Sequence, residues 1–289
     1  MKPLRTRLIN EQRKGKTPWH TLERDYLQSW ILSAISQTEN LHSTLVFKGG
    51  TALKKCYFGD YRFSEDLDFS ALPKAPQGNL LEKSIQNVCE LTQNMLGEYT
   101  AVTLSVEGYR EREPHPEGQE AFTIRCQFPW QREPICKVLV EITRDESLVL
   151  DPIKKPIIHK FGESIENKIL VYSLEEIVIE KLRAILQHTK KLHEREWGRS
   201  RARDYYDLWR ISESYGNHLQ LHNLRNLLEK KCASKNVSFV NADSFFEEKM
   251  VQNARQTWEQ WLSPLMPDLP ECEMLLRELK QTISELLKD

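Results

Sequence analysis

Apolar residues follow two different periods along this chain. In the first half they alternate with polar residues, as in half-buried strands, over 100–108, 120–128 and 136–143. A helical period occupies 79–96, and an earlier helix is expected from Pro18 to about Gln37, with Thr17 as its cap. The first half is therefore expected to mix strands and helices.

The second half shows helical spacing almost throughout. The expected helices cover 173–189, 200–215, 218–231, 243–262 and 271–288. Three prolines, Pro264, Pro267 and Pro270, separate the last two. We therefore expect an α+β protein with two domains: a mixed-sheet core with an N-terminal helix over 1–160, and a mainly helical domain over 161–289.

A strand that ends at a pair of glycines is the first candidate functional feature. Phe47 and Lys48 lead into Gly49-Gly50, and the residues from Thr51 onward begin a helix. Glycine lets the backbone approach an anion, and the N–H groups of a helix N-terminus point toward it. The turn therefore indicates a phosphate site, in which Thr51 either caps the helix or contacts a phosphate oxygen.

A second strand carries two carboxylates on one face. Alternation places Ser64, Asp66, Asp68 and Ser70 together, with apolar residues on the opposite face. Carboxylates this close repel each other unless a cation lies between them, and Mg²⁺ prefers a few oxygen ligands completed by water and phosphate. The pattern favours a metal that binds a nucleoside triphosphate; a solvated strand face is the plain alternative.

Two other segments supply candidate charged groups. Glu141 is the only acid in the apolar and β-branched run 136–143, which makes it a candidate third carboxylate or an edge-strand residue facing water. Ser173 and Glu176 form a capping box for a helix that carries Lys181 beside its apolar stripe. Asp204 lies on the next predicted helix. Without further information, Lys181 reads as a surface lysine and Asp204 as a partner of nearby arginines.

Four blocks together resemble the AbiEii/AbiGii nucleotidyltransferase toxins, a family of the DNA polymerase β-like nucleotidyltransferase superfamily. The blocks are Phe-Lys-Gly-Gly-Thr-Ala-Leu at 47–53, Tyr-Arg-Phe-Ser-Glu-Asp-Leu-Asp-Phe at 61–69, Glu-Lys-Leu-Arg-Ala at 180–184 and Arg-Ala-Arg-Asp-Tyr-Tyr-Asp-Leu at 201–208. The resemblance implies a polymerase β-like core, a toxin of a toxin–antitoxin or phage-defence system, and transfer of a nucleotide from an NTP with release of pyrophosphate.

The resemblance also implies roles for individual residues. The implied catalytic residues are Asp66, Asp68, Glu141, Lys181 and Asp204. Of these, Asp66, Asp68 and Glu141 would bind Mg²⁺ or Mn²⁺. The implied substrate-binding residues are Lys48, Gly49, Gly50, Thr51 and Ser64. Lys181 would contact the triphosphate, and Asp204 would lie near the nucleotide or hold Lys181 in place.

The implied partners are an NTP, an RNA acceptor and a possible cognate antitoxin. Some similar enzymes modify the 3′ end of tRNA, which makes a tRNA the expected acceptor. Two alternatives stay open: transfer to a small molecule or a protein, and a catalytically silent module that binds phosphate or nucleic acid.

The distribution of charge supports a polyanionic partner better than the net charge of −1 does. Residues 181–203 contain eight Lys or Arg against two Glu, and residues 1–24 contain seven against two. Residues 243–289 reverse the balance, with ten acids against five bases. Trp197, Tyr205 and Tyr206 lie in or beside the later basic stretch, where they would stack on an exposed base or fill a helical core.

The sequence predicts a soluble, cytoplasmic protein. No window approaches the ~20 apolar residues of a membrane span, and the basic N-terminus lacks the apolar stretch of a signal peptide. Six cysteines are scattered without Cys-x-x-Cys spacing, which favours reduced thiols over disulfides or zinc.

Overall fold

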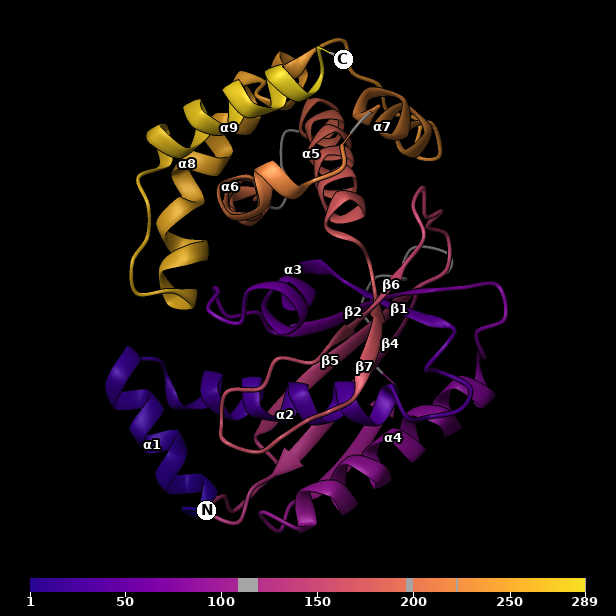
Figure 1. Ribbon diagram of the computed structural model, residues 1–289, viewed down its shortest axis with the longest axis vertical. Coiled ribbons are helices and arrows are strands. Elements are labelled where there is room, and N and C mark those ends of the chain that lie inside the picture. Colours follow the sequence, from indigo (N-terminus) through magenta and orange to yellow (C-terminus); the bar gives the residue numbers. More distant parts are fainter. Residues whose placement is uncertain (109–118, 196–199, 222, 289) are drawn as a thin grey trace. The chain divides into compact units, whose positions relative to one another are not determined.

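The computed structural model describes residues 1–108, 119–195, 200–221 and 223–288 (Figure 1). The chain forms two compact units. The first comprises Met1–Glu146 and Pro152–Tyr172, and the second comprises Ser147–Asp151 and Ser173–Asp289. The domain boundary expected at residue 160 stays a prediction.

The described part of the first unit is built on one seven-stranded mixed sheet, in the order β3-β4-β5-β2-β1-β7-β6. The strands are β1 (Leu45–Lys48), β2 (Asp66–Ala71), β3 (Thr103–Gly108), β4 (Gln119–Gln127), β5 (Cys136–Thr143), β6 (Ile153–Pro156) and β7 (Lys168–Val171). β2 runs parallel to β5 and β1 runs parallel to β7, whereas the other neighbours are antiparallel. The expected α+β class with a mixed sheet is confirmed.

Two long helices bury one side of this sheet. They are α2 (Trp19–Ile35) and α4 (Asn79–Gly97), which pack against each other and against strands of the sheet (Figure 1). Leu67 and Phe69 of β2 belong to the resulting apolar core. Because side chains alternate along a strand, Asp66 and Asp68 lie on the opposite face of β2. The core thus fixes the side of the sheet on which the acids are presented.

Three further helices lie in the described part of the first unit. α1 (Leu4–Gly15) precedes α2, while α3 (Gly49–Ala52) follows β1 directly and continues into the π-helix η1 (Leu53–Phe58). The chain therefore turns from strand to helix at the two glycines, as expected.

The described part of the second unit is mainly helical. Its elements are α5 (Leu174–Arg195), α6 (Ala202–Tyr215), η2 (Gly216–His218), α7 (Leu224–Ala233), η3 (Ala242–Phe245), α8 (Glu248–Leu262), η4 (Ser263–Leu265) and α9 (Cys272–Leu286). α6 packs against α8 and α9, and α5 packs against α7. Buried leucines and isoleucines at helical spacing, such as Leu182 and Ile185, form the packed faces.

Several local predictions were wrong. α1 and the short strands β6 and β7 were missed, and the helix expected from 218 begins at Leu224. The cap position of α2 is Pro18 rather than Thr17, and it forms no side-chain capping bond. Ser64 lies before β2, which begins at Asp66.

Two expectations about the whole chain can be compared with the structure. All six cysteines are free thiols, and five of them are buried. Over the described ranges, no helix has the length and apolar character needed to cross a membrane.

Candidate active site

Gly49 places the turn after β1 against a carboxylate. Its φ is +79°, in the left-handed region that favours glycine, and a Cβ built on it would lie 2.5 Å from Oδ2 of Asp68. Any larger residue at this position would therefore strain the backbone and clash with the Asp68 side chain. The absence of a side chain at Gly49 lets the carboxylate lie beside the backbone of the turn.

Gly50 makes room for Arg62, which belongs to the second of the four blocks but had no expected role. A Cβ on Gly50 would lie 2.5 Å from Nη2 of Arg62, a buried side chain. Thr51 is also buried, and its hydroxyl donates to the carbonyl of Asp66 over 2.5 Å. The glycine turn is thus filled by Asp68 and Arg62 and tied to the start of β2 through Thr51.

The register of the sheet brings Asp68 and Glu141 together. β2 and β5 are parallel, and Asp68 pairs with Glu141 while Asp66 pairs with Leu139. The Asp68 and Glu141 carboxyl groups form a hydrogen bond. Burial and the charge of Glu141 raise the pKa of Asp68 to about 7, against the opposing charge of Lys48. The pair is consequently harder to ionise than an isolated carboxyl group.

The strand end before these acids is held by α2. The side-chain amide of Gln28 donates to the carbonyls of Ser64 and Glu65, over 3.1 Å and 3.0 Å. Gln28 is fully buried, so these bonds fix the backbone that leads into Asp66. The structure thus places Ser64 near the start of the acid-bearing strand through its backbone.

The acidic pair has donors that suit a hard divalent cation. Across the described residues, no three His, Cys, Asp or Glu side chains are arranged to hold one ion. Asp68 and Glu141 nevertheless meet as neighbouring carboxyl groups, and Asp66 lies on the same strand face as Asp68. Mg²⁺ is commonly bound by one or two carboxylates and by substrate phosphates, and it would relieve the repulsion between the two carboxylates. The residues therefore fit such a metal.

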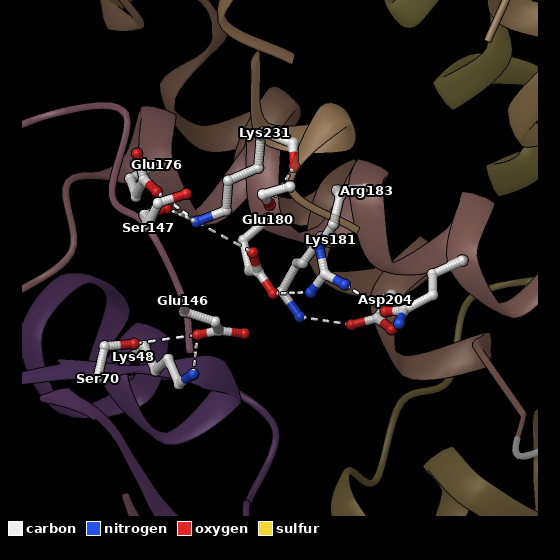
Figure 2. Close-up of polar contacts among 12 residues, drawn as sticks. Lys48, Ser70, Glu146, Ser147, Glu176, Glu180, Lys181, Arg183, Asp204 and Lys231 are labelled. Atoms are coloured by element: carbon white, nitrogen blue, oxygen red, sulfur yellow. Dashed lines mark hydrogen bonds and ion pairs between the residues drawn. The ribbon is translucent and has the colours of Figure 1, made fainter. Parts of the chain in front are cut away.

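Lys48, which directly precedes the turn, belongs to a polar cluster (Figure 2). Its ammonium forms an ion pair with Glu146, whose carboxylate also accepts a 3.0 Å hydrogen bond from Ser70. The Ser70 hydroxyl lies 2.6 Å from that of Tyr172. Glu146 and Tyr172 were missed because they lie outside the recognised blocks, in segments without periodicity.

Lys181 and Asp204 form an ion pair within the second unit (Figure 2). The Lys181 ammonium lies 2.7 Å from an oxygen of Asp204 and 2.7 Å from one of Asp207. Arg201 approaches Asp204 at 3.0 Å. Burial alone would raise the pKa of Asp204, but Lys181 and Arg201 outweigh burial and hold that pKa well below its usual range. One end of the Lys181 side chain is thus fixed by two carboxylates.

A second buried ion pair lies at the N-terminal end of α5. The Lys231 ammonium contacts Glu176 at 2.8 Å and the carbonyl of Ser147 at 2.7 Å (Figure 2). Ser173 accepts a bond from the backbone N–H of Glu176, which is half of the predicted capping box. The Glu176 carboxylate instead accepts bonds from the N–H groups of Val149 and Leu150. Glu176 therefore holds segment 147–151 against α5 within the second unit.

The basic stretch 181–203 lies only partly within the described residues. Residues 196–199, which include Trp197 and Arg199, and the side chain of Arg195 lie outside them. Lys181 and Arg183 are buried in ion pairs. Tyr205 and Tyr206 are buried core residues, so the expectation that these two rings stack on a base is not supported.

Comparisons with known proteins identify the family and a similar fold. The family model "Nucleotidyl transferase AbiEii toxin, Type IV TA system" matches residues 30–287. The fold is similar to that of MenT4, a nucleotidyltransferase toxin from Mycobacterium tuberculosis H37Rv, with a TM-score of 0.62 and 22% identity over 94% of this chain and 85% of that chain. No curated protein matches the chain significantly. The extent of the family match shows that the chain belongs to the AbiEii nucleotidyltransferase toxins of type IV toxin–antitoxin systems.

Proposed function

We propose that this nucleotidyltransferase uses Mg²⁺ or Mn²⁺ to transfer a nucleotide from an NTP to the 3′ end of an RNA, with tRNA as the acceptor. The observation that carries the proposal is the hydrogen-bonded pair Asp68–Glu141, held beside the Gly49 turn. Two adjacent acids next to a strand–glycine–helix turn suit a metal-bound triphosphate.

The chain's own residues account for binding of the triphosphate. Asp66, Asp68 and Glu141 would hold the metal, which when bound neutralises phosphate charge. The N–H groups of the Gly49 turn would face phosphate oxygens. We assign to Lys48 a role in phosphate binding, with Glu146 orienting its ammonium.

The reaction forms one bond and breaks one. The oxygen of the acceptor 3′-hydroxyl attacks the α-phosphorus, and the bond from that phosphorus to the β-phosphate bridging oxygen breaks, so pyrophosphate leaves with the electron pair. We assign acceptance of the hydroxyl proton to Glu141. Lys181, held by Asp204 and Asp207, is assigned to stabilise charge on the triphosphate.

The choice of RNA rests on charge and family. Residues 1–24 contain seven Lys or Arg against two Glu, which favours a polyanionic acceptor over a small neutral one. The toxin family also suggests a cognate antitoxin, and we propose that the protein acts in the cytoplasm, where NTPs and RNA are found.

The acceptor is tested by labelling. Wild-type protein is incubated with each α-³²P-labelled NTP, Mg²⁺ and either total RNA or an RNA-free metabolite and protein extract. We expect label in nuclease-sensitive RNA of tRNA size, and no label there with Asp68→Asn. Label that survives nuclease in the RNA-free extract would instead identify a small molecule or protein acceptor, and binding without label in either arm would identify a silent module.

A further inference from the structure

A basic hollow lies in the first unit, and its lining includes none of the residues assigned above. It has a volume of about 460 Å³ and is lined by α1 and by the loop around Lys160. The lining side chains include four cations, Arg7, Arg13, Lys14 and Lys160, and one carboxylate, Glu11. Since Lys14 pairs with Glu11 at 2.7 Å, positive charge remains in excess at the rim.

The floor of the hollow is held by a buried ion pair. The Arg7 guanidinium binds both carboxylate oxygens of Glu163, at 2.5 Å and 2.6 Å, and the Glu163 side chain is fully excluded from solvent. The hydroxyl of Tyr26 donates to the same carboxylate over 2.7 Å. Gly162 has a φ of +105°, so glycine is favoured at the turn in the wall. These contacts give the hollow a fixed shape.

The dipole of α1 explains the position of only some of the cations at this hollow. Arg13 and Lys14 lie in the last turn of α1, where cations are favourable because the helix dipole is negative at its C-terminus. That effect does not account for Lys160, which comes from a distant segment and meets them at the same hollow. Arg13, Lys14 and Lys160 are all exposed, so an anion from solvent can reach them.

The distance from the hollow to the Gly49 turn follows from the helical segment that joins them within the first unit. The Lys160 side chain lies against Gly59, where a Cβ would be 3.2 Å from its Cε. Gly59 ends the helical segment α3–η1, which begins at Gly49. Ten helical residues, six of them in a π-helix, span at most about 15 Å. A stacked strand carries one phosphate per about 3.4 Å of its axis, so it covers that length in at most four to five nucleotides.

We propose that this hollow binds backbone phosphates of the acceptor RNA a few nucleotides away from the reacting 3′ end. The inference rests on the proposed RNA acceptor and adds a second site of contact to it. Arg13, Lys14 and Lys160 supply exposed charge for the phosphates, while Arg7 forms the fixed floor. Phosphate contacts of this kind position a strand without reading its sequence.

The test reverses the exposed charges and measures RNA binding directly. The variant Arg13→Glu, Lys14→Glu, Lys160→Glu is compared with wild type and with a matched variant, Lys83→Glu, Arg132→Glu, Lys137→Glu, whose residues are exposed elsewhere on the first unit. The probes are fluorescein-labelled single-stranded RNAs of three and twelve nucleotides with the same 3′ end. Fluorescence anisotropy gives Kd from 50 to 300 mM salt, and circular dichroism checks folding.

We expect the reversal to weaken binding of the twelve-nucleotide RNA at least tenfold at 100 mM salt. Its log–log salt slope should become shallower by about 2, which corresponds to roughly three lost phosphate contacts at 0.7 each. The three-nucleotide RNA should bind within twofold of wild type, because it is too short to span the two sites. The matched variant should differ less than twofold with both probes.

The proposal is overturned if the reversal affects the long RNA no more than the matched variant does, or if it weakens both probes equally. Nucleotide transfer is measured separately with labelled NTP. If wild type transfers no label to RNA but the reversal still removes binding of the long RNA, the proposed activity is contradicted and the RNA-binding role of the hollow is supported. If label is transferred to RNA and the reversal leaves RNA binding and its salt slope unchanged, the RNA-binding role of the hollow is contradicted and the proposed activity is supported.

Discussion

Asp68 and Glu141 face each other across the parallel strands β2 and β5 and share a hydrogen bond. Burial and mutual repulsion raise the pKa of Asp68 to about 7, so the two carboxylates are held ionised only at a cost. The two acids are unfavourable for folding in this state and suited to binding a divalent cation. Stability and activity should consequently respond in opposite directions when one acid is removed.

The first prediction concerns Glu141→Gln. Without metal, the variant loses the repulsion between two carboxylates, and the protein should be stabilised by about 1 kcal/mol at pH 8. Nucleotide transfer should fall by on the order of a hundredfold, because a metal-binding oxygen and the proton acceptor are lost. Thermal unfolding in EDTA and labelled-NTP transfer in Mg²⁺ measure the two effects. A variant that is both destabilised and fully active contradicts this assignment; exposed Glu133→Gln is the control.

The second prediction uses two glycines with positive φ. Gly49→Ala combines backbone strain with a Cβ 2.5 Å from Asp68, whereas Gly78→Ala has strain alone, because a Cβ there meets nothing within 4 Å. Both variants should lose on the order of 1 kcal/mol of stability from strain. Only Gly49→Ala should also lose most of its transfer activity, since it displaces the Asp68 carboxylate. Equal activity in the two variants would show that the turn does not position Asp68.

The third prediction concerns acid stability. Burial alone would raise the pKa of Glu163, but hydrogen bonds from His159, Arg7 and Tyr26 outweigh burial and lower it to about 2. A lowered carboxyl pKa contributes stability that is present above the unfolded pKa of 4.5 and is lost as pH falls toward 2. Its size is on the order of 3 kcal/mol.

The measurement is the free energy of urea unfolding from pH 7 to pH 2.5. Glu163→Gln should be less stable than wild type at pH 7, and the difference should narrow steadily below about pH 4.5. Wild type and variant curves that stay parallel over this range would show that Glu163 does not titrate with folding.

The fourth prediction distinguishes the role of the Lys181 charge in nucleotide transfer from its contribution to stability. Lys181→Ala leaves Asp204 and Asp207 without their shared ammonium, and removing one partner of a buried ion pair costs about 3–5 kcal/mol. Lys181→Met with Asp207→Asn removes the charges of Lys181 and Asp207, leaves Asp204 paired with Arg201, and should recover much of that stability. Transfer should stay lost in both, and Lys181→Arg should retain little, because a planar fork does not replace a point charge.

These variants are assayed by thermal unfolding and by labelled-NTP transfer under saturating NTP. If the double variant recovers activity together with stability, Lys181 has a structural role alone.

The sequence predicted those elements whose pattern is local. The strands around Asp68 and Glu141 were found because their alternation is strong, and the turn at Gly49 was found because two glycines follow an apolar run. α1 was missed since few of its positions are apolar. β7 was missed since four residues are too few for a period to appear.

Long-range pairing accounts for the site residues that were missed. Glu146 meets Lys48 from a segment nearly a hundred positions away, and Arg62 fills the space left by Gly50. No spacing in the sequence signals either contact, because each depends on how the folded chain brings separate segments together. The Glu176–Lys231 pair likewise joins two helices that only packing brings together.

The central claim is that the Asp68–Glu141 pair binds the metal used in nucleotide transfer to RNA. The most direct test is incorporation of α-³²P-labelled NTP into tRNA by wild type, Asp68→Asn and the exposed control Asp151→Asn, with Mg²⁺ varied from zero to 10 mM. We predict Mg²⁺-dependent labelling by wild type and by Asp151→Asn, and background labelling by Asp68→Asn at every Mg²⁺ concentration. Labelling by a folded Asp68→Asn at the wild-type rate would contradict the claim.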